Sequence, residues 1–254
     1  MEWAPGYREW APPPELGGSV ACLWARVVPP GAGQTTLVLP DACSDLIWQS
    51  GRGVFVAGSD TRPWPSASPA GTVMAGVRLR PGAGGAALGL PLSALLNQRV
   101  EASDLGPGVG ARLARSLGPA LAPAAALRLL ASEVRRLVLD HPPDPLVTEA
   151  ARLLGQPGAQ AGEVAARLGV GERQLLRRCR AAVGYGPATL RRVLRFRRFV
   201  DRIDAGEGQP GGPGLARLAA GTGYADQAHL TRECVRLAGL PPAALTAARR
   251  AAAT

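Results

Sequence analysis

Apolar residues change their spacing along the chain near residue 119. Before that point they form short runs separated by Pro, Gly and Asp, a pattern typical of strands joined by turns. The runs are SVACLWARVV, QTTLVLP, DLIWQ, GVFVAG and GTVMAGVRLRPGAGG. We therefore expect residues 1–118 to form a β-rich domain, for which a cupin-like barrel is one option.

From residue 119 onward the spacing becomes helical, beginning with PALAPAAALRLLASEVRRLVLD. The segment HPPDP then ends the helix, because proline lacks an amide hydrogen and disfavours helix in the residue before it. We predict a helical linker and proline hinge over residues 119–144, whose helix either packs on the first domain or forms a dimer face. Residues 145–254 are expected to be all-α, which gives an α+β, two-domain protein.

A repeat lies within the helical part. VAARLGVGERQLLRRCRAAVGYGP (164–187) aligns with LAAGTGYADQAHLTRECVRLAGLPP (218–242), at an offset that grows from 54 to 55 residues. Each copy has the form of a short helix, a tight turn and a second helix, which predicts two helix-turn-helix units. Gly169 and Gly223 end the first helices, where a positive φ is often required. Asp226 is expected to cap the second helix of the second copy.

The second helix of each copy has one apolar and one polar face. The predicted buried stripes are Leu175, Cys179, Ala182 and Val183 in the first copy, and Leu230, Cys234 and Leu237 in the second. Arginine is suited to guanine and glutamine to adenine in the major groove. The alternative is an ordinary solvated face. The candidate DNA-binding residues are Arg173, Gln174, Leu176, Arg177, Arg180, Gln227, Ala228, His229, Thr231 and Arg232.

Charge supports the same interpretation, because it is unevenly placed. Residues 1–150 hold 12 Arg and 12 acidic residues, whereas residues 151–254 hold 17 Arg and 7 acidic residues, so the second part carries the net charge of +10. A basic module attached to a neutral one is typical of binding to a polyanion. Charge alone also fits a membrane surface.

The C-terminal residues resemble the DNA-binding domain of the AraC/XylS family of bacterial transcription regulators. The resemblance rests on the paired helix-turn-helices, on GYADQAHLTRE followed by GLPP, and on the helix PATLRRVLRFRRFVDRI. It implies two helix-turn-helix subdomains joined by that long helix, with recognition helices in successive major grooves of promoter DNA. It also implies RNA polymerase as a partner, and a monomer or homodimer. The sequence departs from the family at Cys179 and Cys234, where an aromatic residue is usual, and in the glycine-rich loop over residues 205–214.

The N-terminal half resembles the sensor region of one subgroup of these regulators, through LPDACSDLIW and GVRLRPGAGGAALGLPLSALLNQRVEASDL. This implies a regulatory domain without specifying its effector, either a small molecule or a partner. The five tryptophans all lie in this half, where they either pack in the core or line a pocket. Arg78 and Arg80, expected on one strand face, either pair with an acidic effector or are solvated. The candidate effector-binding residues are Trp24, Trp48, Arg78 and Arg80.

Several other functions are disfavoured. An alkylation-responsive repair and regulatory protein with Cys22 or Cys43 as acceptor is the alternative function, although buried, unreactive cysteine is the usual state. Asp41 and Asp45 have two alternative roles: they bind a ligand or metal, or they cap turns. With two histidines and no CxxC pair, we expect neither a metal site, a cofactor nor an enzyme. Without a signal peptide or apolar span, we expect a cytoplasmic protein that is not in a membrane.

Overall fold

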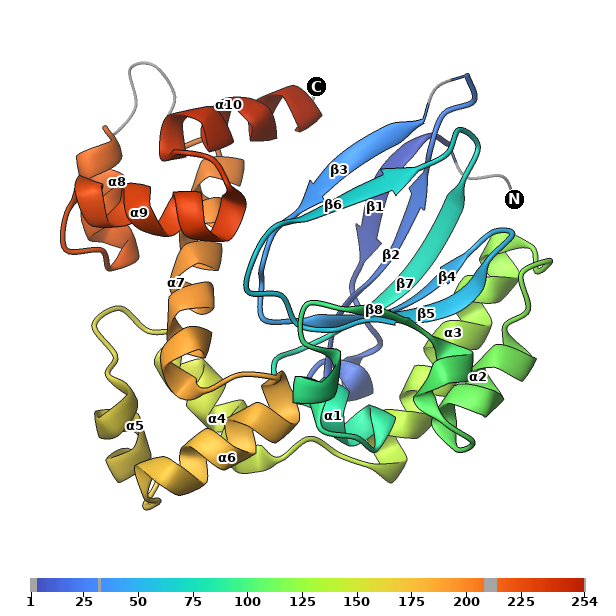
Figure 1. Cartoon of the computed structure of the whole chain (residues 1–254), viewed down its shortest axis with the longest axis horizontal. Helices are drawn as coiled ribbons and strands as arrows, with labels where there is room; N and C mark the ends of the chain where they lie inside the picture. The colour runs from blue at the N-terminus through green and yellow to red at the C-terminus, as the bar shows by residue number, and fades with distance from the viewer. Residues whose placement is uncertain (1–3, 32, 208–213, 254) are drawn as a thin grey trace.

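The computed structural model describes residues 4–31, 33–207 and 214–253. A β-rich part is followed by a helical part (Figure 1), which confirms the expected α+β fold with two domains. Residues 208–213 of the expected glycine-rich loop lie outside the described residues. In the part of the chain that is described, no helix has both the length and the apolar character needed to cross a bilayer.

Six antiparallel strands form the main sheet, in the order β1-β2-β7-β4-β5-β8. Their bounds are β1 Gly6–Trp10, β2 Val20–Val27, β4 Ser44–Gln49, β5 Gly53–Ala57, β7 Val73–Leu79 and β8 Arg99–Glu101. The sheet is open, with β1 and β8 at its edges. A two-stranded ribbon, β3 (Gln34–Val38) and β6 (Trp64–Ser68), lies over one face, where Arg26 hydrogen-bonds Thr36 and the Arg99 guanidinium stacks on Trp64. The arrangement is therefore an open sheet covered by a ribbon.

Side chains alternate between the two faces of this sheet. The face under the ribbon carries a small cluster of buried residues: Cys22, Trp24, Ile47, Phe55, Ala57 and Met74. Gly76, opposite Trp24 on β7, leaves the space that the indole ring occupies, because a Cβ there would overlap the ring. Trp48 is fully buried in the cluster on the opposite face.

The opposite face packs against α3 (Pro123–Asp140). The helix buries Ala126, Leu130, Val134, Leu137 and Val138, which recur at helical spacing and join the core beneath β4 and β7. Of the two roles left open for this helix, the structure thus shows packing on its own domain. The other short elements here are η1 (Pro14–Leu16), α1 (Ala83–Leu88), η2 (Leu92–Leu95), η3 (Ala102–Leu105) and α2 (Val109–Ser116).

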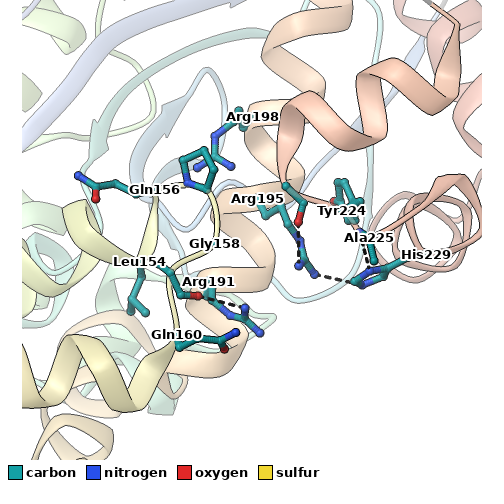
Figure 2. Close-up of a pocket in the computed structure, with 13 residues that line it drawn as sticks. Leu154, Gln156, Gly158, Gln160, Arg191, Arg195, Arg198, Tyr224, Ala225 and His229 are labelled. Atoms are coloured by element: carbon teal, nitrogen blue, oxygen red, sulfur yellow. Dashed lines mark hydrogen bonds between the residues drawn. The ribbon is translucent and has the colours of Figure 1, made fainter.

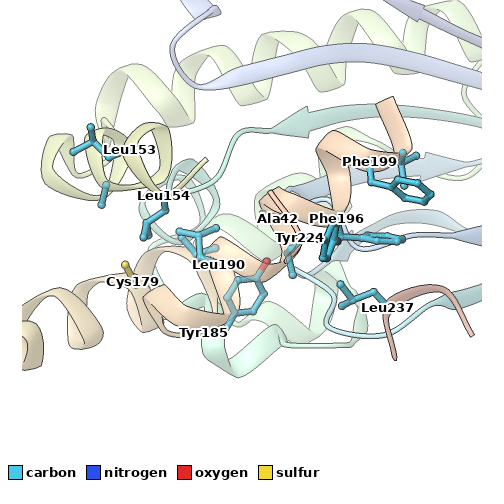
Figure 3. Close-up of a cluster of buried hydrophobic side chains, with 14 of the residues drawn as sticks. Ala42, Leu153, Leu154, Cys179, Tyr185, Leu190, Phe196, Phe199, Tyr224 and Leu237 are labelled. Carbon is cyan, nitrogen blue, oxygen red and sulfur yellow. The ribbon is translucent and has the colours of Figure 1, made fainter. Parts of the chain in front are cut away.

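Helices α4 to α10 form the C-terminal part around a second core. Their bounds are α4 Pro145–Leu154, α5 Ala161–Arg167, α6 Glu172–Val183, α7 Pro187–Asp204, α8 Leu215–Thr222, α9 Gln227–Ala238 and α10 Pro242–Ala253. The long helix α7 runs between the pairs α5–α6 and α8–α9 and buries Phe196 and Phe199 at its centre (Figures 1 and 3). Ala42 of the N-terminal part joins this core, so the two parts are in contact.

The proline-rich break lies where the sequence predicts it. Helix α3 ends at Asp140 and α4 begins at Pro145, with Asp144 as its N-cap. The Asp144 carboxylate accepts a hydrogen bond from the Leu146 amide at 3.0 Å. Proline is favoured at this first helical position because its missing amide hydrogen would have no helical partner there.

Candidate nucleic-acid interface

The two repeats fold as predicted into helix-turn-helix units, α5–α6 and α8–α9. Gly169 and Gly223 follow the first helices with φ of +66° and +86°, which confirms the left-handed backbone expected in the turns. Asp226 caps α9 by accepting a hydrogen bond from the His229 amide at 2.6 Å. The local sequence signals therefore account for both turns.

The second helix of each unit buries the predicted stripe. Leu175, Cys179, Ala182 and Val183 are buried in α6, as are Leu230, Cys234 and Leu237 in α9. The cysteines that replace the usual aromatic residue are fully enclosed, and burial raises the pKa of Cys179 to about 11 and that of Cys234 to about 12. Both thiols are therefore neutral core groups near pH 7.

The opposite faces of α6 and α9 are largely free of such packing. Exposed side chains from the candidate set are Arg173, Gln174, Arg177 and Arg180 on α6, and Gln227, Ala228 and Arg232 on α9. Leu176 is half-buried beside Gly186, so its remaining surface is apolar and small. Arg177 and Arg232 occupy equivalent positions of the repeat, and both are exposed.

His229 and Thr231 are more engaged within the protein than the sequence suggests. The His229 ring is half-buried, edge-on to Tyr224 with centroids 5.3 Å apart, and its Nε2 lies 3.3 Å from Nη2 of Arg195. The Thr231 hydroxyl donates to the Gln227 carbonyl at 2.9 Å. Either residue would have to exchange these contacts to hydrogen-bond a base.

The sequence did not show which arginines of α7 could reach phosphates. In the structure, these arginines point in different directions. Arg191, Arg195 and Arg198 line a hollow of about 360 Å³ between the two helix-turn-helix units (Figure 2). Its other walls are the segment from Leu154 to Gln160 and residues of the second unit, including Tyr224 and His229. Arg197 instead faces the N-terminal part, where its Nη1 lies 3.5 Å from Oδ2 of Asp41.

Glu233 is a residue that sequence reasoning missed. It lies on α9, is only 7% exposed, and its Oε2 lies 3.1 Å from Nε of Arg192 and 3.5 Å from Nη2 of Arg195. This carboxylate joins the second recognition helix to α7. In the sequence, the only sign of a role for Glu233 was an acidic residue next to Arg232. That sign did not indicate which residues of α7 it pairs with.

The first recognition helix also contacts the N-terminal domain. Its C-terminal half packs on α1 and η2, and a Cβ added at Gly85 would lie 2.6 Å from the carbonyl oxygen of Ala181. Arg178 pairs with Asp144 at 3.2 Å in the hinge. The second unit approaches this domain at Gly239, which lies near Pro63.

Of the four candidate effector residues, the structure brings only Trp24 and Arg78 together. Trp24 donates from Nε1 to Asp45 at 2.7 Å on the ribbon-covered face, and Nε of Arg78 lies 3.3 Å from the same carboxylate. The indole nitrogen of Trp48 donates to the Gly118 carbonyl on the other side of the sheet. The expectation that Arg78 and Arg80 share a strand face is wrong, because β7 ends at Leu79 and Arg80, exposed beyond it, donates to the carbonyl of Gly17.

Arg78 has partners of its own on the ribbon-covered face. Its Nε lies 3.6 Å from Asp41 as well as 3.3 Å from Asp45, and the attraction of Asp45 raises the pKa of the guanidinium. Asp41 also accepts a hydrogen bond from the Cys43 amide at 2.9 Å, which confirms the turn-capping interpretation for Asp41. Asp45 instead lies within β4 and accepts the hydrogen bond from Trp24. A search of the described residues finds no group of His, Cys, Asp or Glu able to hold a metal ion.

Comparison with known proteins supports these assignments. A family described as "Helix-turn-helix domain" matches residues 164–248, which contain both units, and "Domain of unknown function (DUF6597)" matches residues 8–101. The C-terminal part carries an AraC-type helix-turn-helix domain. With this AraC-type domain, the protein is a DNA-binding transcription regulator. A search of the curated proteins finds no match.

Solved structures of ToxT from Vibrio cholerae are similar to this chain at 9% identity. ToxT from strain O395 gives a TM-score of 0.44 over 87% of this chain and 95% of that one. The same protein bound to (E)-4-(8-methylnaphthalen-1-yl)but-3-enoic acid gives 0.45 over 86% and 100%. Wild-type ToxT from strain SCE256, bound to an unsaturated fatty acid, gives 0.44 over 90% and 95%.

Proposed function

We propose that α6 and α9 read base edges in two successive major grooves of a promoter. The observation that carries this proposal is the pair of equivalent arginines, Arg177 and Arg232, which both units expose on the side opposite their buried stripes. A helix-turn-helix presents the N-terminal part of its second helix to the bases, and arginine binds guanine O6 and N7 with two hydrogen bonds. Gln174 and Gln227, also exposed near those N-termini, are suited to adenine.

Substituting either arginine tests this assignment. Arg177→Ala and Arg232→Ala should each weaken binding to the preferred duplex by about 1–3 kcal/mol and relax base preference at one position. The measurement is selection of bound duplexes from a random pool, followed by titration of the preferred duplex. Arg128→Ala, an exposed arginine on α3, is the matched control and should leave the selected sequence unchanged. Unchanged base preference in both variants would contradict the base-reading roles.

The N-terminal domain then acts as the regulatory part, in response to a small molecule or a partner. The contacts of α1 and η2 with α6, and of Asp41 with Arg197, support this role because they connect the β-rich domain to the DNA-binding helices. The ribbon-covered face with Trp24 and Arg78 is the part of the candidate effector set that stays together. The protein acts without catalysis in the cytoplasm, as a monomer or homodimer, with RNA polymerase as its partner at the promoter.

The alternative function, alkyl transfer to an N-terminal cysteine, is less well supported. Burial raises the pKa of Cys22 to about 11 and that of Cys43 well above its ordinary value, which suppresses the thiolate that such a transfer needs. We expect no mass increase after the protein is mixed with alkylated DNA and analysed by mass spectrometry. A gain of one alkyl group in the parent, lost in Cys22→Ser or Cys43→Ser, would reverse this conclusion.

A further inference from the structure

The hollow between the two helix-turn-helix units is lined by three arginines on one side of α7. Arg191, Arg195 and Arg198 recur at intervals of four and three residues, so their side chains leave the helix on the same face (Figure 2). Among the described residues that line the hollow there is no Asp or Glu. The nearby carboxylate of Glu233 pairs with Arg195 from outside this lining.

Each guanidinium is held in place by one backbone carbonyl. Nη1 of Arg191 donates to Ala159 at 3.1 Å, that of Arg195 to Gly223 at 3.4 Å, and that of Arg198 to Thr222 at 3.0 Å. The Arg195 side chain also stacks on Tyr224, with its central carbon 4.5 Å from the ring centroid. Groups fixed in this way lose little further entropy when they bind an anion.

The three cations have donor capacity left over. Arginine carries five N–H donors, and the carbonyl contacts use one on each side chain. Nη2 of Arg195 is also engaged, with His229 at 3.3 Å and Glu233 at 3.5 Å, so Arg191 and Arg198 have the larger number of donors left. Nε of Arg195 is buried with no hydrogen-bond partner. Burial lowers the pKa of Arg198, and the like charge of Arg195 acts in the same direction. An anion in the hollow would relieve that repulsion and accept hydrogen bonds from the donors of Arg191 and Arg198 that the carbonyls leave free.

We propose that this hollow is a binding site for a phosphate group of the DNA backbone, at the position between the two grooves that α6 and α9 enter. The proposal rests on the base-reading function above and adds a specific contact that carries no sequence information. Phosphate suits the site because guanidinium groups bind it with paired, charge-assisted hydrogen bonds. The hollow also lies at the lower end of the volumes usual for ligand pockets.

The DNA arm of the test measures salt dependence. Arg198→Gln and Arg191→Gln are made separately in the full chain, with Arg128→Gln as the control of equal charge change. Each hollow variant should bind preferred and random duplexes more weakly by a similar factor, about tenfold. The slope of log Kd against log salt concentration should also decrease by about one, which is the change expected when one phosphate contact is lost. Thermal unfolding of each variant establishes that it is folded.

The second arm uses inorganic pyrophosphate as the probe, titrated into the full chain by calorimetry. Saturable binding that both hollow variants weaken, and that the preferred duplex displaces, is the expected result. If pyrophosphate and the duplex bound to the protein at the same time, the hollow would not be a site for a phosphate of the DNA backbone. If folded hollow variants match the parent in salt slope and pyrophosphate binding, the site itself is rejected. That result leaves base reading intact, provided the parent still prefers its own sequence over random DNA.

Discussion

Gly169 turns the chain between α5 and α6 with a φ of +66°, in open space where an added Cβ would meet no atom within 4 Å. Replacing it with alanine therefore imposes backbone strain without a steric clash. Gly169→Ala should lower the free energy of unfolding by about 1–2 kcal/mol. Urea unfolding followed by circular dichroism measures the loss.

Gly18→Ala is the matched control for this turn, because Gly18 also has open space around its Cβ position but lacks a positive φ. The control should change stability by less than about 0.5 kcal/mol. Equal losses in the two variants would mean that the left-handed backbone is not what requires glycine in the turn.

Individual residues in the helical units could be predicted from sequence because their signals are local. The caps, the positive φ and the buried stripes depend on neighbours within about one helical turn, and all of them are as expected. The effector residues could not be assigned in the same way. Trp24 and Trp48 lie on different strands, so their opposite faces follow from how β2 and β4 pair with β7, which one strand's alternation does not reveal.

Helices α7 and α9 are joined through Glu233, a carboxylate that is 7% exposed and pairs with Arg192 and Arg195. Glu233→Ala should lower the free energy of unfolding by about 2–4 kcal/mol, because it leaves guanidinium groups without their carboxylate partner. The measurement is again urea unfolding, which reports the stability of the whole fold.

Glu149→Ala provides the comparison for this joint. Glu149 pairs with Arg152 on the exposed side of α4, with both side chains more than 40% exposed. Exposed ion pairs contribute little, so its loss should stay below about 1 kcal/mol. If both substitutions cost the same, Glu233 does not hold α9 against α7.

From residue 119 onward, the sequence predicted the existence and order of the helices better than how they are joined. It did not predict α1 and α2, which lie within the part expected to be β-rich. The break at HPPDP and the long helix α7 follow from proline positions and helical spacing. The contact of α9 with α7 depends on residues more than 30 positions apart, Arg195 and Glu233, which only tertiary packing brings together. For the same reason the packing of α3 on its own sheet was left as one of two options.

Where the two domains meet, the Asp41 carboxylate lies between Arg78 of the β-rich domain and Arg197 of α7. Its Oδ2 lies 3.6 Å from Nε of Arg78 and 3.5 Å from Nη1 of Arg197, while Oδ1 accepts the hydrogen bond from Cys43. Asp41→Asn can keep the hydrogen bond from the Cys43 amide but removes the attraction for both arginines. We expect it to loosen the contact between the β-rich domain and α7, and so to release the DNA-binding part from the β-rich domain, while Arg197 keeps its 2.6 Å pair with Asp201.

The expected effect of Asp41→Asn is tighter DNA binding in the absence of effector, by about two- to fivefold, the range that a partly exposed ion pair allows. Fluorescence anisotropy with the preferred duplex measures it. Asp140→Asn, which removes the same charge from an exposed pair with Arg136, should have no effect. Unchanged or weaker binding in Asp41→Asn would show that this contact does not restrain the DNA-binding part.

The composition and charge of the whole chain indicated a neutral domain and a basic one, but not the surface where they meet. That surface uses small residues, such as Gly85 against Ala181 and Ala42 within the helical core, which leave no recognisable pattern in a sequence. It also uses the contact between Asp41 and Arg197, two residues that are more than 150 positions apart in the sequence.

The two recognition helices are anchored differently: α6 packs along α1 and η2, whereas α9 is held by α7 through Glu233. Both helices also pack on α7 within one core, which fixes their placement relative to each other. A shift of the β-rich domain would therefore act directly on α6 and reach α9 only through that core. An effector that moves this domain would change the affinity for the half-site read by α6 more than the affinity for the half-site read by α9.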